Sequence, residues 1–187
     1  MVVSLMALWI PIVLAAAFVF VASSIIHMVL PYHQSEYRQL PDEDKILAAL
    51  RPYSLKPGLY NFPHCDHKNM KTPEIQAKFK QGPVGFLTMM QSGPPNMGKF
   101  LGLWFGFCLV VSIFTAYLTG RTVAAGSPYL MVFRVAGTTA FMAYGVGLLS
   151  NGIWKGQPWS MVFKEFFDGI VYCVLTGVAF AWLWPHA

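Results

Sequence analysis

The chain contains 187 residues, of which 56% are hydrophobic and only 11% are charged, and its mean hydropathy is +0.51. Soluble domains carry roughly a quarter charged residues, so this composition excludes an ordinary water-soluble domain. It also excludes intrinsic disorder, which requires low hydrophobicity and a high density of charge. The formal net charge of +5 does not indicate nucleic-acid binding, because no polar domain remains to form a groove once the apolar segments are set aside. We therefore expect an integral membrane protein whose main partner is the lipid bilayer.

Four apolar segments are long enough to cross a bilayer as α-helices, which takes about 20 residues each. The first segment carries no charge before Pro31, and a signal peptide is disfavoured because no basic residue precedes this long run. Lys99 and Arg121 flank the second segment, and Pro185 follows the fourth. The sequence predicts an all-α integral membrane protein, a four-transmembrane-helix bundle with helices at 7–30, 98–119, 128–152 and 165–184.

The charged side chains are distributed unevenly between the two ends of these helices. All of them except Arg121 and Arg134 lie in residues 31–99 or 152–168. Lys and Arg collect on the cytoplasmic side of membrane proteins. We therefore expect a multi-pass protein of the bacterial inner (plasma) membrane, with both termini periplasmic or external.

Residues 31–97 form the one sizeable polar segment, and we expect them to fold as a cytoplasmic loop subdomain. An acidic first turn followed by strong helix formers predicts a short helix within residues 41–50. A second short helix is predicted from Thr72, as its N-cap, to Gly82. Residues 58–62 and 84–89 have the composition of two short strands that can pair as a ribbon.

Polar and ionisable residues recur at the predicted cytoplasmic ends of the helices. Ionisable groups at this depth are costly unless they are paired, so we expect a hydrogen-bonded cluster at the cytoplasmic mouth of the bundle. Its candidate members are His27, His33, Glu36, Asn151, Glu165 and Asp168. The cluster either ties the loop to the bundle or forms a proton-linked or substrate site.

A second group of potential ligands lies inside the polar loop. His64, Cys65 and His67 are residue types that bind zinc or copper. Adjacent residues of an extended chain point in opposite directions, so a complete site needs ligands from elsewhere, such as His33. A polar turn without a metal is the alternative interpretation, and no other cofactor is predicted.

One charged residue, Arg134, lies inside the third predicted membrane helix. Intramembrane arginines are candidates for function, although one close to a helix end can extend its guanidinium to the interface. No acidic residue is expected at its level. Arg134 therefore either reaches the interface or meets an anionic lipid or another subunit.

Small residues recur every four positions on two of the predicted helices. Such stripes let helix backbones approach closely in lipid. They consist of Gly98, Gly102 and Gly106 in the second helix and of Gly169, Cys173, Gly177 and Ala181 in the fourth. The spacing predicts close helix contacts, either inside the chain or with another protomer.

Three segments of the second half together resemble a known family. Residues 151–159, the pair Asp168-Gly169 and residues 182–184 are similar to the third-to-fourth helix region of a bacterial family of small four-helix inner-membrane proteins of uncharacterised function. This resemblance implies a four-helix membrane fold and supplies no catalytic residues.

The sequence lacks the common catalytic and nucleotide-binding motifs, including a Walker loop, a dinucleotide fingerprint and a nucleophile elbow. The first interpretation is therefore a non-enzymatic accessory or assembly subunit of a larger membrane complex, or a homo-oligomer. One alternative is a small transporter or lipid-binding protein. Another is a metal-handling protein that uses His64 and His67.

Overall fold

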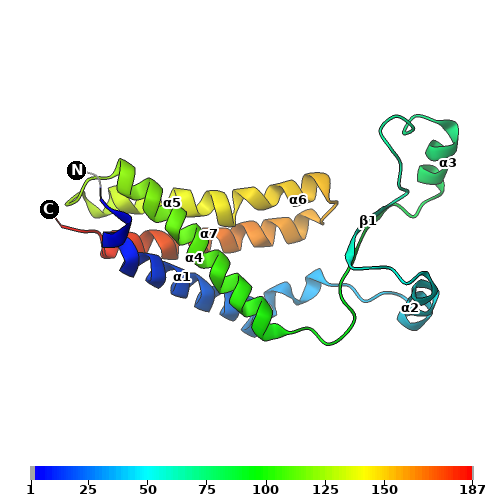
Figure 1. Ribbon diagram of the computed structural model, residues 1–187, viewed down its shortest axis with the longest axis horizontal. Helices are drawn as coiled ribbons and strands as arrows, with labels where there is room; N and C mark the ends of the chain where they lie inside the picture. Colours follow the sequence, from blue (N-terminus) through cyan, green and yellow to red (C-terminus); the bar gives the residue numbers. More distant parts are fainter. Residues whose placement is uncertain (1–2, 187) are drawn as a thin grey trace. The chain divides into compact units, whose positions relative to one another are not determined.

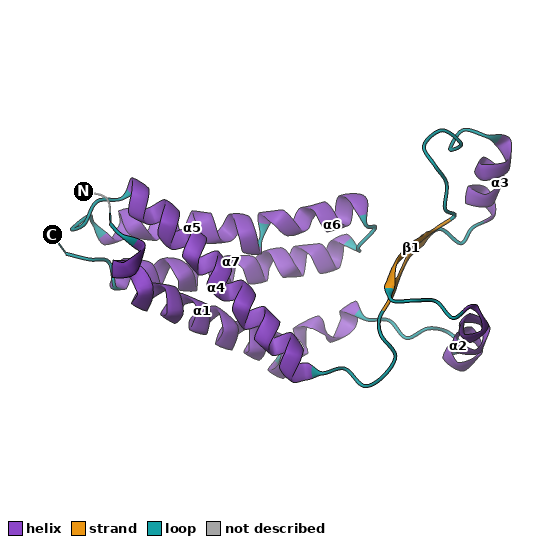
Figure 2. Ribbon diagram, in the orientation of Figure 1, coloured by secondary structure: helices purple, strands orange, loops and turns teal. Residues whose placement is uncertain are grey.

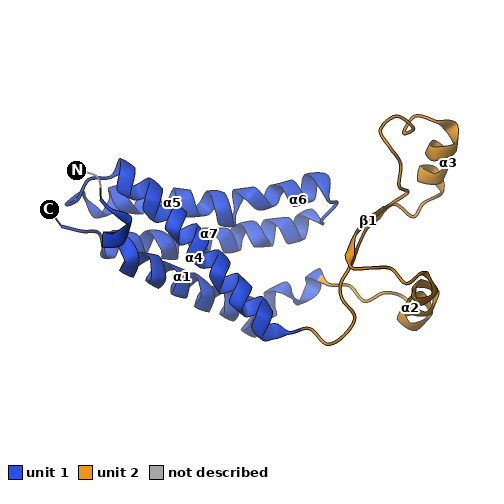
Figure 3. Ribbon diagram, viewed as in Figure 1, with its two compact units in different colours: residues 1–36, 96–187 blue, residues 37–95 orange. Residues whose placement is uncertain are grey.

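The structure, a computed structural model, describes residues 3–186 of the chain (Figure 1). It is mostly helical, and four helical segments are long and apolar enough to cross a membrane, which confirms the expected multi-pass membrane architecture. These segments are Leu5–Val29, Met97–Thr122, Tyr129–Trp154 and Trp159–Trp182. Residues 1–36 and 96–187 form one compact unit, and residues 37–95 form a second one (Figure 3).

The first membrane segment changes its helical geometry along its length. It begins with a 3-10 turn, η1 (Leu5–Leu8), and continues as the α-helix α1 (Trp9–Ser24). It ends in a π-helical turn, η2 (Ile25–Val29), which carries His27. The chain then forms a separate 3-10 helix, η3 (Pro31–Glu36). Because π-helical turns are rare and frequently occur at functional sites, η2 points to this end of the bundle as the place of a site.

Three more membrane segments complete the first unit. α4 (Met97–Thr122) packs against α1 and α5, while α7 (Trp159–Trp182) packs against α1 and α5 (Tyr129–Tyr144), so the four segments close into a bundle (Figure 2). The N- and C-termini lie at the same end of this bundle, away from the connection that leads into α7 at residues 155–158 (Figure 1). Two clusters of buried apolar side chains fill its interior, one including Leu8, Val132 and Phe180 and the other including Val19, Cys108 and Tyr172.

Two glycines of α7 permit a close approach to α5. A Cβ added to Gly169 would lie 2.7 Å from the Cα of Gly145 and 2.8 Å from the carbonyl oxygen of Tyr144. A Cβ added to Gly177 would lie 2.8 Å from the ring of Phe133. Neither position has room for a larger residue without a shift, so these glycines make an internal helix contact of the kind that small residues permit in membranes.

The third membrane segment is interrupted at the same level. After Gly145, residues Val146–Leu148 form a 3-10 turn, η5, and Leu149–Trp154 form a short helix, α6. Gly169 of α7 lies against this interruption. The expected continuous helix over 128–152 did not include the break, because glycines within an apolar run do not by themselves interrupt a membrane helix.

The fourth membrane helix starts earlier than the expected residue 165, and this boundary is corrected here. Pro158 precedes the first turn, and α7 begins at Trp159. Lys164, which was expected to precede the helix, and Glu165, which was expected at its first position, both lie well inside it. The helix accommodates these charges because both side chains have polar partners, described below.

The second unit, residues 37–95, contains the elements that the sequence predicts. β1 (Gly58–Phe62) and β2 (Gly85–Met89) pair antiparallel, with Gly58 opposite Met89. Two short helices accompany this ribbon, α2 (Glu43–Leu50) and α3 (Pro73–Gln81). Thr72 occupies the N-cap position of α3, but its hydroxyl donates to a carbonyl oxygen of the preceding turn instead of capping the helix.

Candidate metal centre

Three potential metal ligands converge at the end of the bundle where η3 begins. Within residues 3–186, His27, His33 and Asp168 are the group of His, Cys, Asp and Glu side chains whose ligand atoms all lie within 4.8 Å of one another. His27 comes from η2, His33 from η3 and Asp168 from α7. His33 and Asp168 are buried, whereas the side chain of His27 is 46% exposed. Elements that are distant in the sequence thus bring two imidazoles and one carboxylate together.

His33 lies between two carboxylates. Its Nε2 lies 2.8 Å from Asp168 Oδ2, which is within ion-pair distance, and both atoms are buried. The other ring nitrogen, Nδ1, lies 2.6 Å from Oε1 of Glu36. A carboxylate only accepts hydrogen bonds, and a neutral imidazole carries one N–H. The two carboxylates around His33 therefore need either a doubly protonated ring or a neutral ring with a bound cation between Nε2 and Asp168.

The ligand spacing suits a tetrahedral metal ion. Zinc binds nitrogen and oxygen at about 2.0–2.2 Å, which places the ligands of a tetrahedral site roughly 3.3 Å from one another. The observed distances to Asp168 Oδ2 bracket this value, at 2.8 Å from His33 Nε2 and 3.7 Å from His27 Nε2. Three such ligands leave a fourth position for water or a bound molecule.

Glu36 and Lys164 support the centre from outside the ligand set. The contact of Glu36 with His33 Nδ1 is the arrangement by which carboxylates orient metal-binding histidines and fix their tautomer. Lys164 Nζ lies 3.8 Å from Glu36 Oε1 and donates to the carbonyl oxygen of Tyr32 at 2.6 Å and to the hydroxyl of Ser35 at 3.0 Å. These bonds tie η3 to α7, so they hold His33 against the helix that carries Asp168.

The cluster has more negative than positive side chains. Three carboxylates, Glu36, Glu165 and Asp168, accompany the single ammonium of Lys164. Removal from water, and then the carboxylates of Asp168 and Glu36, raise the pKa of the neighbouring Tyr32 phenol above its ordinary value. With neutral histidines, the excess negative charge equals the charge of one divalent cation.

A cavity of about 220 Å³ adjoins the ligand cluster inside the bundle. His27 and Asp168 lie on one side of this cavity, and Glu165 also lines it. The remaining wall is mostly aromatic and is formed by Trp104, Phe107, Tyr144 and Tyr172. The open coordination position of a bound metal would therefore have space beside it for a second molecule.

No family model, curated protein or solved structure matches this chain. The resemblance to a family of four-helix inner-membrane proteins stays a prediction, and the site is interpreted from its own geometry.

The structure brings together five of the six residues expected at the mouth of the bundle. His27, His33, Glu36, Glu165 and Asp168 lie in or beside the cluster. Asn151 has only backbone bonds there, since its carbonyl oxygen accepts from the amides of Lys155 and Gln157.

Two further members of the cluster were missed by sequence reasoning. Tyr172 places its hydroxyl 3.4 Å from His27 Nε2, and Gln157 donates to Glu165 Oε1 at 3.0 Å. Lys164, Asp168 and Tyr172 follow one another at intervals of four residues. This spacing places all three side chains on one face of α7. That spacing was the available signal.

The loop ligands have a different environment. His64 Nδ1 lies 3.0 Å from Asn61 Oδ1, and both histidines of this group, His64 and His67, are exposed, while Cys65 is half-buried. Metal binding by these loop residues stays a prediction.

Arg134 lies in α5 near the opposite end of the bundle. Its side chain is exposed and lines a groove of about 210 Å³ together with Thr138 and Phe141 of α5 and Cys173 and Val174 of α7. Within residues 3–186, Arg134 has no ion-pair partner.

The two small-residue stripes have different surroundings. Gly169 and Gly177 lie at the close contact with α5, and the backbone of Cys173 approaches Gly137. On α4, by contrast, a Cβ on Gly102 or Gly106 would have no neighbour within 4 Å, and one on Gly98 would meet only a side-chain oxygen of its own N-cap residue.

Proposed function

We propose that this membrane protein binds a divalent transition-metal ion of the zinc class at His27, His33 and Asp168. The observation that carries the proposal is the convergence of three ligand atoms, which lie within 4.8 Å of one another, with His33 Nε2 2.8 Å from Asp168 Oδ2. A metal ion bound between these atoms would satisfy the carboxylate and both imidazoles. Glu36 then serves as the carboxylate that orients a metal-bound histidine.

The ligand set favours zinc or ferrous iron over magnesium and calcium. Imidazole suits zinc, copper, iron and nickel, whereas magnesium and calcium prefer oxygen ligands throughout. A set of two histidines and one carboxylate with an open position is typical of sites where the metal acts on a bound molecule. This proposal moves metal handling from the loop at His64 and His67 to the end of the membrane bundle.

The proposal is tested by metal titration of the full-length protein. The protein is purified in a mild detergent, treated with a chelator and titrated with Zn²⁺ against a chromophoric competitor. We expect one tight site, and we expect Asp168→Asn and His33→Gln to abolish it. Zinc at 100 times its Kd should also stabilise the wild-type protein by about 2.7 kcal/mol, because a ligand that binds only the folded state shifts the unfolding equilibrium.

The loop histidines provide the matched control. A His64→Ala, His67→Ala variant should retain the tight site, because neither residue belongs to the converging group. Loss of zinc binding in this control, together with normal binding by folded Asp168→Asn, would overturn the proposal. Far-UV circular dichroism and gel filtration establish that each variant is folded.

We further propose that the metal centre lies at the cytoplasmic side of a bacterial inner membrane. The support is the distribution of charge, since Arg121 and Arg134 are the only charged residues on the side of the termini. Reporter fusions after Lys68 and after the C-terminus test this orientation. Activity of both reporters on the same side of the membrane would refute it.

A second candidate function is that of a subunit in a larger membrane assembly or homo-oligomer. The open face at Gly102 and Gly106 favours it, because a face of small residues without an internal partner suits contact with another membrane helix. Introducing leucine at Gly106 should then lower the mass of the assembly measured by native electrophoresis from membranes. An unchanged mass in this variant, with wild-type expression, would exclude this face as the contact.

A further inference from the structure

The aromatic cavity beside the ligand cluster contains buried polar atoms that lack partners. Tyr144 is 3% exposed, and its hydroxyl has no hydrogen-bond partner among the residues that the structure describes. Oε2 of Glu165 is likewise buried and unpartnered, although Oε1 accepts from Gln157. Asp168, also unpartnered at Oδ2, lines the same cavity. Buried polar groups are normally satisfied, and Asp168 Oδ2 is a ligand of the proposed metal. The two atoms that remain, on Tyr144 and Glu165, point to a polar molecule that completes the site.

The walls of the cavity indicate the chemical character of the rest of that molecule. The rings of Trp104, Phe107, Tyr144 and Tyr172 contact one another, with centroids 5.4–6.4 Å apart. Such a wall binds apolar surface, while Tyr144 and Glu165 bind a group that both donates and accepts hydrogen bonds. With a divalent cation at the ligand cluster the carboxylates are neutralised, and the cavity then suits an uncharged polar group.

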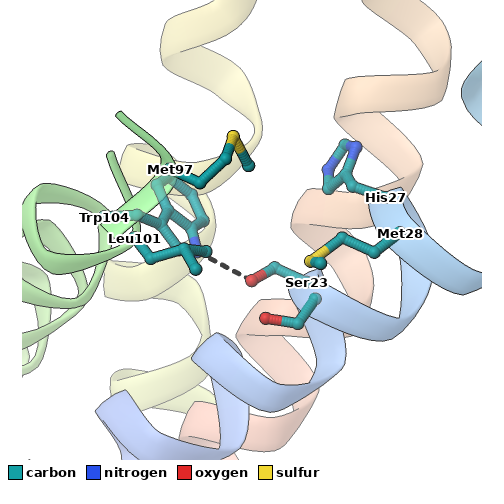
Figure 4. A pocket seen from close by; sticks show the side chains of 7 residues that line it. Ser23, His27, Met28, Met97, Leu101 and Trp104 are labelled. Atoms are coloured by element: carbon teal, nitrogen blue, oxygen red, sulfur yellow. Dashed lines mark hydrogen bonds between the residues drawn. The ribbon is translucent and has the colours of Figure 1, made fainter. Parts of the chain in front are cut away.

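A second cavity adjoins the first. It measures about 260 Å³ and shares His27 and Trp104 with the aromatic cavity. Its lining is almost entirely apolar and includes Met28, Met97 and Leu101 (Figure 4). Figure 4 shows Trp104 of α4 and His27 of η2 on its two sides. Because this groove lies between two membrane helices, α1 and α4, it is open to a lipid chain.

Trp104 lines both cavities. Its indole Nε1–H donates to the hydroxyl of Ser23 at 2.7 Å, which fixes the ring across the α1–α4 contact (Figure 4). Glu165 and Asp168 line only the aromatic cavity, whereas Met28, Met97 and Leu101 line only the second one.

We infer that the two cavities together bind a neutral single-chain lipid. Its uncharged head, bearing hydroxyl or amide groups, lies between Tyr144 and Glu165 and next to Asp168, and its chain follows the groove between α1 and α4. The hydrogen-bonding head is assigned from the unpartnered atoms, and the single chain from the one apolar groove that shares a wall with the aromatic cavity. An oxygen of the head would be next to the open position of the proposed metal, which is the one step that rests on the proposed function.

The test uses monooleoylglycerol whose chain carries two bromine atoms, in phosphatidylcholine nanodiscs that contain the full-length protein. Bromine quenches tryptophan fluorescence on contact, so saturable quenching reports occupancy near Trp104. We expect Tyr144→Phe to weaken binding about tenfold, the equivalent of one buried hydrogen bond. The same change at Tyr117, which is exposed on α4, is the matched control and should leave binding unchanged.

Several outcomes separate this inference from the proposed metal site. Equal binding by Tyr144→Phe, Glu165→Gln and the wild type would overturn the lipid site, even if zinc binds as expected. The exposed tryptophans, such as Trp9 and Trp182, are quenched without saturation by lipid in the bilayer, so the saturable component alone reports the site. A saturable component that persists unchanged in Trp104→Phe would likewise overturn the lipid site. If no variant binds zinc but Tyr144→Phe still weakens lipid binding, the lipid site stands and the metal site falls.

Discussion

The contact between α5 and α7 makes a quantitative prediction for the Gly169→Ala variant. The added methyl would lie 2.7 Å from Gly145 Cα and 2.8 Å from both Gly145 N and Tyr144 O. Non-bonded carbon atoms prefer about 3.5–4.0 Å, so the helices would have to separate locally by about 0.8 Å. All three neighbours are backbone atoms, and therefore no side-chain rotation relieves the overlap.

The expected cost follows from two opposing effects. Overpacking of a close contact costs about 1–3 kcal/mol, and a clash with backbone alone belongs at the upper end of that range. The higher helix propensity of alanine offsets up to about 1 kcal/mol of this cost. We therefore expect Gly169→Ala to lower the free energy of unfolding by about 2 kcal/mol, or the melting temperature by roughly 4–8 °C for a chain of this size.

A thiol-reactive dye provides the assay for this variant. Cys108 is fully buried and becomes reactive when the bundle opens, so heating the detergent-solubilised protein with the dye gives an unfolding midpoint. Cys65, in the polar unit, is replaced by serine in all samples to lower the background. Gly102→Ala is the matched control, since nothing lies within 4 Å of the added methyl. A Gly169→Ala midpoint equal to that of Gly102→Ala would refute the close contact.

Two further substitutions test the supports of the candidate site. Glu36→Gln should weaken zinc binding about tenfold in competition titrations, because it removes the charge that orients a histidine ligand, whereas Glu43→Gln in the polar unit should have no effect. Trp104→Phe removes the donor to Ser23 and should cost about 1 kcal/mol in thermal unfolding, while the same change at Trp182, which is 67% exposed, should leave the midpoint unchanged.

The membrane segments could be predicted from the sequence because hydropathy and length decide them almost alone. The short helices and the ribbon of residues 37–95 were predictable for a related reason, since acidic first turns, prolines and glycines act within a few residues of their own position. The start of α7 was misjudged because charged residues were taken to mark the end of a membrane span. Lys164 and Glu165 remain inside the helix since each has a polar partner.

The polar cluster was predictable in membership and unpredictable in geometry. Residues at the same end of several helices share a depth, which identified five of its members. The sequence does not show in which direction each side chain points. The prediction therefore included Asn151 and missed Tyr172. The π-helical turn at Ile25–Val29 could not be predicted either, because it changes the rotation of His27 without leaving any signature in the composition.

The glycine stripes illustrate the same limit. Their spacing is identical in the second and fourth helices and predicts that a backbone can come close, but it does not identify which backbone does. In the structure, Gly169 and Gly177 contact α5, whereas Gly102 and Gly106 have no internal neighbour. Only the arrangement of the helices distinguishes a packed face from an open one.

The packing of α7 also determines which ligand of the proposed centre moves when a metal binds. Asp168 directly precedes Gly169 and is therefore held on the most closely packed part of the bundle. His33 is buried and fixed through Nδ1 by Glu36. His27, in contrast, is half-exposed on the π-helical turn, and its Nε2 lies 3.7 Å from Asp168 Oδ2, beyond the roughly 3.3 Å edge of a tetrahedral site. We therefore expect His27 to be the ligand that moves when the ion binds. His27 also lines both cavities. Metal binding and the shape of the lipid groove would in that case change together.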